Sequence, residues 1–146
     1  MTEFTYSPPD EPVRVIHADA EVLLVDKPAG LLSVPGKGEH LADCMMARVL
    51  RLYPEALLVH RLDLDTSGVM VFALTRHAQR TLGAQFENRQ TKKVYRARLW
   101  GHLSPKEGRV DLPLIERCAD AIPQTACRRP SATVAASATR APRWPG

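Results

Sequence analysis

A short polar segment near the middle of the chain holds the residues best suited to chemistry. Residues 60–68 read His60-Arg61-Leu62-Asp63-Leu64-Asp65-Thr66-Ser67-Gly68. Carboxylates can act as nucleophiles or bases, and a nearby guanidinium favours their ionised form. Buried without partners, neutral polar groups would each destabilise the fold by about 1–3 kcal/mol, and charged groups by more. These side chains must therefore pair with one another or with a polar ligand.

The two acids of this segment allow one metal-dependent interpretation. Asp63 and Asp65 could bind a magnesium ion through two carboxylates. This would make the protein a nuclease whose RNA cleavage EDTA abolishes. Asp-x-Asp is common by chance, however, and no third ligand is evident in the sequence. Otherwise we expect Asp65 to face solvent or to cap a turn.

Strands and helices must position the polar segment. The apolar run 69–74 is long enough for one buried strand and too short to cross a membrane. Periodicity predicts further strands at 13–17, 21–27, 57–59 and 93–100, a helix from Leu41 that Pro54 ends, and a helix over 77–88. The elements do not follow a strict β-α-β order. The sequence therefore predicts an α+β fold with a mixed, largely antiparallel sheet and flanking helices.

Composition narrows the class of protein. The chain has 146 residues, of which 45% are hydrophobic and 25% charged, so it can form a globular domain with a core. Its N-terminus lacks the basic start and apolar stretch of a secretory signal. Three cysteines, Cys44, Cys118 and Cys127, show neither metal-ligand spacing nor an even disulfide set. We expect a cytoplasmic protein without a metal or cofactor, not bound to a membrane and monomeric.

Positive charge is concentrated in one stretch of the chain. The net charge of the whole chain is +4. Between residues 76 and 98, Glu87 is the single acid among seven basic residues: Arg76, Arg80, Arg89, Lys92, Lys93, Arg96 and Arg98. Such a stripe suits a phosphate backbone, although a solvated basic face would look the same. Taken alone, such a stripe is more often a solvated face than a surface that binds nucleic acid.

Three segments together resemble one known family. Residues 60–68 resemble the catalytic motif of the RluA-type pseudouridine synthases, residues 23–36 their opening strand and loop, and residues 92–97 their lysine-x-tyrosine strand. The resemblance implies the catalytic-domain fold of that family. It also implies isomerisation of uridine to pseudouridine in structured RNA, without a cofactor.

The resemblance assigns roles to individual residues. Asp63 matches the catalytic aspartate, which acts as a nucleophile toward the ribose or as a base. Arg61 would keep that carboxylate ionised and fill the gap left by a flipped base. Tyr95 matches a tyrosine that packs on the uracil ring. The expected RNA-binding residues are His60, Lys27, Lys92, Lys93 and Arg96.

The resemblance also suggests how the chain is organised. We expect an extended arm over residues 1–12, a partial catalytic domain over 13–115, and a disordered tail rich in Ala, Arg and Pro over 116–146. No counterpart of the family's third motif is found after residue 115. This predicts a truncated or frame-shifted member, and one alternative function is an inactive fragment that retains only RNA binding.

The substrate is expected to be rRNA, tRNA or both. The chain begins almost directly with the catalytic segment and leaves no room for an N-terminal RNA-binding module. Together with residues 31–36, this resembles the small members that modify both large-subunit rRNA and the tRNA anticodon stem-loop.

Overall fold

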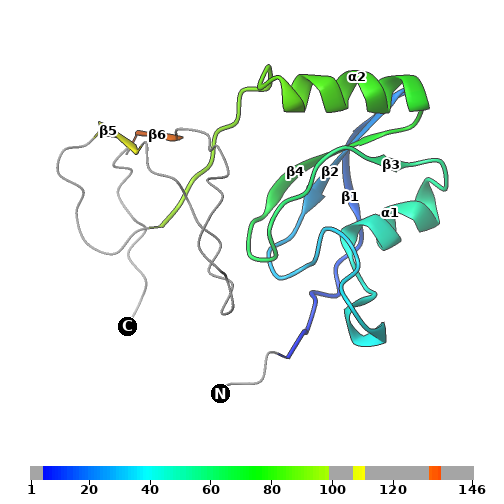
Figure 1. Cartoon of the computed structure of the whole chain (residues 1–146). Coiled ribbons are helices and arrows are strands. Elements are labelled where there is room, and N and C mark those ends of the chain that lie inside the picture. The colour runs from blue at the N-terminus through cyan, green and yellow to red at the C-terminus, as the bar shows by residue number, and fades with distance from the viewer. Residues whose placement is uncertain (1–4, 99–106, 111–131, 136–146) are drawn as a thin grey trace, which may run out of the picture. The chain divides into compact units, whose positions relative to one another are not determined.

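The computed structural model describes residues 5–98, 107–110 and 132–135 (Figure 1). The chain divides into two compact units, residues 1–94 and 95–146. The first unit contains the polar segment and the elements that position it.

An antiparallel sheet forms the framework of the first unit. Its strands, in spatial order, are β1 (Arg14–Ala18), β2 (Val22–Lys27), β4 (Gly68–Ala73) and β3 (Leu57–Leu58). Every neighbouring pair is antiparallel. Together with two helices, this sheet confirms the predicted α+β fold. The polar segment joins β3 to β4, which are neighbours in the sheet.

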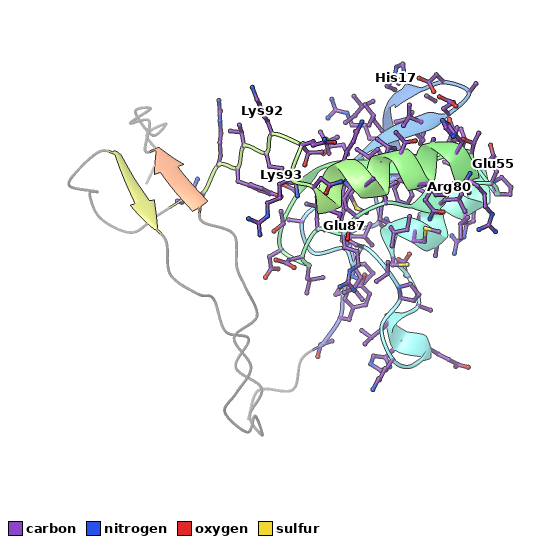
Figure 2. The ribbon with its side chains drawn as sticks, turned by 45° about the horizontal axis from the view of Figure 1, so that its top comes forward. His17, Glu55, Arg80, Glu87, Lys92 and Lys93 are labelled. Carbon is purple, nitrogen blue, oxygen red and sulfur yellow. The ribbon has the colours of Figure 1, made fainter. Side chains whose placement is uncertain are left out.

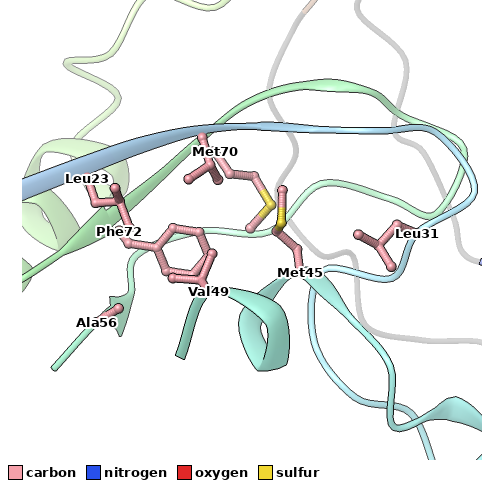
Figure 3. Close-up of a cluster of buried hydrophobic side chains, with 8 residues drawn as sticks. Leu23, Leu31, Met45, Val49, Ala56, Met70 and Phe72 are labelled. Carbon is pink, nitrogen blue, oxygen red and sulfur yellow. The ribbon is translucent and has the colours of Figure 1, made fainter. Parts of the chain in front are cut away.

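One face of the sheet carries the hydrophobic core. Side chains alternate along β2, so that Leu23 and Val25 are fully buried. The register places them opposite Phe72 and Met70 of β4. Helix α1 (Met45–Leu52) covers them, as Figure 3 shows, with its buried side chains including Val49. Burying a side chain of this size stabilises the fold by about 1.5–3 kcal/mol.

The two helices begin where side chains can cap them. The Thr75 hydroxyl accepts a hydrogen bond from the Ala78 N–H at 3.1 Å, so α2 (Arg76–Glu87) begins within one residue of the predicted start. Helix α1 begins at Met45, although periodicity predicts a start at Leu41. Extended backbone at Cys44 separates α1 from a short 3₁₀ turn, η1 (Glu39–Leu41).

The described part of the N-terminal arm, residues 5–12, forms no helix or strand and is hydrogen-bonded to the rest of its unit. The Tyr6 hydroxyl donates to the Asp43 carbonyl at 2.8 Å and accepts from the Leu32 N–H at 3.0 Å. The Arg48 guanidinium donates to the carbonyl of Pro9 at 2.9 Å and also pairs with the Asp43 carboxylate at 2.6 Å. These contacts fix the arm against the loop that precedes α1.

Within the described residues, the structure does not contain the strand predicted at residues 93–100. Residues 93–98 form no strand, and residues 99 and 100 of the expected strand lie outside the described part. A strand needs a partner for its backbone groups, and no described strand pairs with these residues. Conversely, β6 (Ala132–Ala135) pairs antiparallel with β5 (Glu107–Val110). Of the tail over residues 116–146, the structure describes only residues 132–135, which form β6, so the expected disorder of the tail stays a prediction.

Candidate active site

The polar segment presents alternate side chains to solvent. Arg61, Asp63 and Asp65 are exposed, whereas the intervening Leu62 and Leu64 are partly buried. Leu62 packs against the hydrophobic core. This alternation leaves the three charged side chains available to a ligand while the leucines anchor the segment.

A serine from another loop holds the backbone just before Asp63. The Ser33 hydroxyl donates to the Leu62 carbonyl at 2.5 Å and accepts from the Leu62 N–H at 3.0 Å. Ser33 is only 4% exposed, so water competes little for these bonds. The sequence analysis did not single out Ser33, because a hydroxyl in an irregular loop carries no periodic signal.

The backbone just after Asp63 is held by the same loop. The Leu64 carbonyl accepts from the Gly30 N–H at 2.9 Å and from the Lys27 ammonium at 3.1 Å. Gly30 has φ +80°, a conformation that favours glycine. Since Leu62 and Leu64 are both held, the backbone is fixed one residue before and one residue after Asp63.

Lys27 corrects the sequence analysis, which expected it to bind RNA. Its side chain is fully buried, because β2 ends with Lys27 on the apolar face of the sheet. Besides Leu64, its ammonium donates to the carbonyls of Pro28 at 2.9 Å and Leu31 at 2.6 Å. Three carbonyls thus replace its water shell, and no donor is left for a phosphate.

The buried ammonium also contributes charge to the site. Burial lowers the pKa of Lys27, while the negative charges of Asp65 and Asp63 raise it. Lys27 is therefore a structural and electrostatic support for the segment.

A glycine ends the polar segment where β4 begins. Gly68 has φ +126°, which side-chain-bearing residues rarely adopt. A Cβ at this position would meet no atom within 4 Å, so the requirement for glycine comes from the backbone conformation. The turn that precedes it is closed by the Thr66 N–H, which donates to the Asp63 carbonyl at 3.1 Å.

His60, the first residue of the segment, is turned into the fold. Its Nε2 accepts a hydrogen bond from the Val71 N–H of β4 at 3.1 Å. Burial lowers its pKa, so the imidazole is neutral near pH 7. Because Nε2 is already hydrogen-bonded to Val71, it is not free to contact a phosphate as the sequence analysis expected.

The other residues expected to bind RNA are accessible. Lys92, Lys93 and Arg96 are exposed, and Figure 2 shows both lysines on the segment that leaves the C-terminal end of α2. Tyr95 is 63% exposed and belongs to the second unit, whereas Asp63 belongs to the first.

A metal centre at Asp63 and Asp65 would need further ligand side chains close to these two carboxylates. Within the described residues, no group of three or more His, Cys, Asp or Glu side chains could hold a metal ion. In the same part of the chain, no helix has the length and apolar character needed to cross a membrane.

Curated relatives match a large part of the chain. Over 111 residues it is 57% identical to the "Dual-specificity RNA pseudouridine synthase RluA" of Escherichia coli strain K12, which covers 75% of this chain and 51% of that protein. The protein of the same name from Vibrio vulnificus is 48% identical over 116 residues, which covers 79% of this chain and 46% of that protein. The chain spans about half the length of these relatives.

The fold and a family model agree with these relatives. The solved structure of "Human RNA Pseudouridylate Synthase Domain Containing 4" is 25% identical with a TM-score of 0.52, covering 71% of this chain and 41% of that one. The model of the RNA pseudouridylate synthase family matches residues 21–141, which extends past residue 115, where we expected the resemblance to end. The polar segment, its supporting loop and these matches agree: the chain belongs to the RNA pseudouridylate synthase family.

Proposed function

We propose that this chain carries the catalytic aspartate of an RNA pseudouridine synthase, with Asp63 as that residue. In the reaction the bond from ribose C1′ to uracil N1 breaks, a bond from C1′ to C5 forms, the hydrogen on C5 leaves as a proton, and N1 takes up a proton. The observation that carries the proposal is an exposed Asp63 whose flanking residues are both hydrogen-bonded to the segment 27–33, in which Lys27 and Ser33 are buried. A fixed carboxylate can meet C1′ as a nucleophile, or act as a base, with little reorganisation.

Arg61 is proposed to assist by charge and by position. It lies two residues before Asp63 and is exposed in the same alternating pattern. A uridine inside a helix or a stacked loop cannot be reached without being flipped out. The positively charged guanidinium of Arg61 could fill the space that the base vacates.

RNA is proposed to bind through the basic residues of α2 and the segment that follows. Arg76 and Arg80 of α2 and Lys92 and Lys93 after it are exposed. Contacts of this type position a phosphate backbone and weaken with salt. From the family resemblance of the sequence, we propose rRNA, tRNA or both as substrates, in the cytoplasm, with Tyr95 and Arg96 also contacting the RNA. No cofactor is required by this chemistry.

Tritium release tests the proposal directly. RNA carrying tritium at uridine C5 is incubated with the wild-type chain, with Asp63→Asn, and with Asp65→Asn as a matched control. Asp65 has the same charge and lies two residues away, also exposed. We expect release from the wild type and from Asp65→Asn, and a loss of at least about 1,000-fold with Asp63→Asn.

Each other outcome has a distinct meaning. Equal release from Asp63→Asn would remove Asp63 from the chemistry. No release from the wild type, with RNA binding retained, would support the alternative of an inactive RNA-binding fragment. RNA cleavage that EDTA abolishes would instead indicate a nuclease.

A further inference from the structure

An aromatic contact links the polar segment to α2. The ring of Phe86, in the last turn of α2, stacks on the imidazole of His60, with 4.6 Å between ring centroids and 17° between ring planes. Both side chains are partly buried. Stacked rings of this geometry stabilise the fold by more than the burial of their surface alone. They also restrict rotation of the His60 imidazole.

The orientation of the imidazole matters because it makes a directional bond. His60 Nε2 must point its lone pair at the Val71 N–H, which lies 3.1 Å away. His60 precedes Arg61 directly, and Val71 lies in β4, beyond the end of the polar segment. This single bond therefore ties the start of the segment to the strand that follows it.

The surroundings of the imidazole keep it able to accept this bond. Burial contributes most to lowering the pKa of His60, the Lys93 charge lowers it further, and a backbone hydrogen bond at Arg61 raises it. The Lys93 ammonium also lies 4.8 Å from the centroid of the Phe86 ring. The groups that face His60 are thus the uncharged Phe86 from α2, the Lys93 cation from the segment after it, and the backbone of Arg61.

We propose that Phe86 is a positioning residue for the isomerisation, acting through the imidazole of His60 on the backbone that carries Arg61 and Asp63. This inference rests on the proposed function. Phe86 lies outside the three segments that carry the family resemblance. A small displacement of the aspartate would lower the rate of reaction more than it lowers the affinity for RNA.

Two substitutions distinguish the effect of the aromatic ring of Phe86 from the effect of its volume. Phe86→Leu keeps an apolar side chain but removes the stacking surface, and Phe86→Tyr keeps the ring. We expect Phe86→Leu to lower kcat about tenfold with KM within about twofold, and Phe86→Tyr to retain wild-type values. Leu82→Ala, one turn earlier in α2, is the control for loss of packing and should lower stability without this loss of kcat.

The dependence of kcat on pH gives a readout that simple destabilisation would not move. Protonated His60 has no free lone pair, so kcat should fall as the pH drops through the pKa of His60. In Phe86→Leu the imidazole is better hydrated, its pKa rises, and the fall in kcat moves to higher pH. In His60→Gln, whose amide oxygen can accept without titrating, this fall should disappear.

The outcomes distinguish this inference from the function on which it rests. Wild-type kcat and an unmoved pH profile in Phe86→Leu would overturn the positioning role while leaving the proposed function intact. Loss of kcat in Phe86→Leu and Leu82→Ala alike, with no shift of the pH profile, would also overturn it. Inactivity of the wild type, seen before any variant is compared, would overturn the proposed function and this inference with it.

Discussion

Two parts of this chain carry family motifs, yet they are held in very different ways. Around residues 60–68, the backbone of the residues on either side of Asp63 is hydrogen-bonded to Ser33, Gly30 and the buried Lys27. Residues 92–98, in contrast, form neither helix nor strand and are all exposed. The first motif has its partners within its own unit, in a loop that follows β2.

The difference shows which hydrogen-bond partners each kind of segment needs in order to adopt a fixed conformation. An irregular polar loop can be fixed by a few buried donors and acceptors from one neighbouring loop. An alternating segment such as 93–98 needs a strand alongside it to take up its backbone groups. Three predictions follow this comparison, from the largest expected effect on stability to the smallest.

Replacing Lys27 with methionine should have the largest effect. Methionine keeps the apolar stem but leaves the carbonyls of Pro28 and Leu31 without this donor, whereas the Leu64 carbonyl keeps its bond from the Gly30 N–H. We expect the free energy of unfolding to fall by about 3 kcal/mol, because buried acceptors are then unsatisfied. Urea unfolding followed by far-ultraviolet circular dichroism measures this change.

The matched control for Lys27 is Lys37→Met, since Lys37 is exposed. Its free energy of unfolding should stay within about 0.5 kcal/mol of the wild type. If Lys27→Met were as stable as this control, the buried ammonium would not hold the two loops together, and the contrast with residues 92–98 would lose its main support.

Replacing Ser33 with alanine should have an intermediate effect. The variant removes the hydroxyl that both donates to and accepts from Leu62, next to Asp63. We expect a loss of about 1–2 kcal/mol in the free energy of unfolding, with lower tritium release from the protein that remains folded. Ser7→Ala, at an exposed serine of the arm, is the control. Unchanged tritium release from Ser33→Ala would mean that the backbone beside Asp63 needs no anchor.

Replacing Tyr95 with phenylalanine should have the smallest effect on stability. Tyr95 is 63% exposed, so the free energy of unfolding should change by less than about 0.5 kcal/mol. If its hydroxyl moves a proton in the reaction, tritium release should fall by about 100-fold or more. Val94→Ala, at a side chain that is 92% exposed, should change neither quantity. Wild-type tritium release from Tyr95→Phe would leave Tyr95 with a packing role at most.

Periodic segments were the part of the fold that could be predicted from the sequence. The apolar run 69–74 located β4, the residue pattern of 21–27 located β2, and the helical spacing of Leu82 and Phe86 located α2. The start of α1 was wrong by one turn, since the capping conformation at Cys44 has no strong signal in the sequence.

The candidate site was predictable in its exposed residues and not in its supports. Asp63 and Arg61 could be named as site residues because they are part of the family motif, and their roles stay predictions. The roles of Ser33 and Phe86 depend on contacts across 29 residues of chain in one case and on the packing of α2 in the other. Lys27 was misassigned because a lysine after a strand usually remains in water, and only the tertiary structure supplies three carbonyls to replace that water.

The burial of Lys27 makes its amine a chemical probe for local opening of the structure around Asp63. Amine-reactive acylating reagents need a solvated, neutral amine, and Lys27 is fully buried in the native state. Exposed lysines such as Lys37 and Lys92 should therefore be acylated at once. Lys27 should react only in molecules whose two loops have separated, so its labelling rate, read by mass spectrometry, would report how often the backbone around Asp63 comes loose.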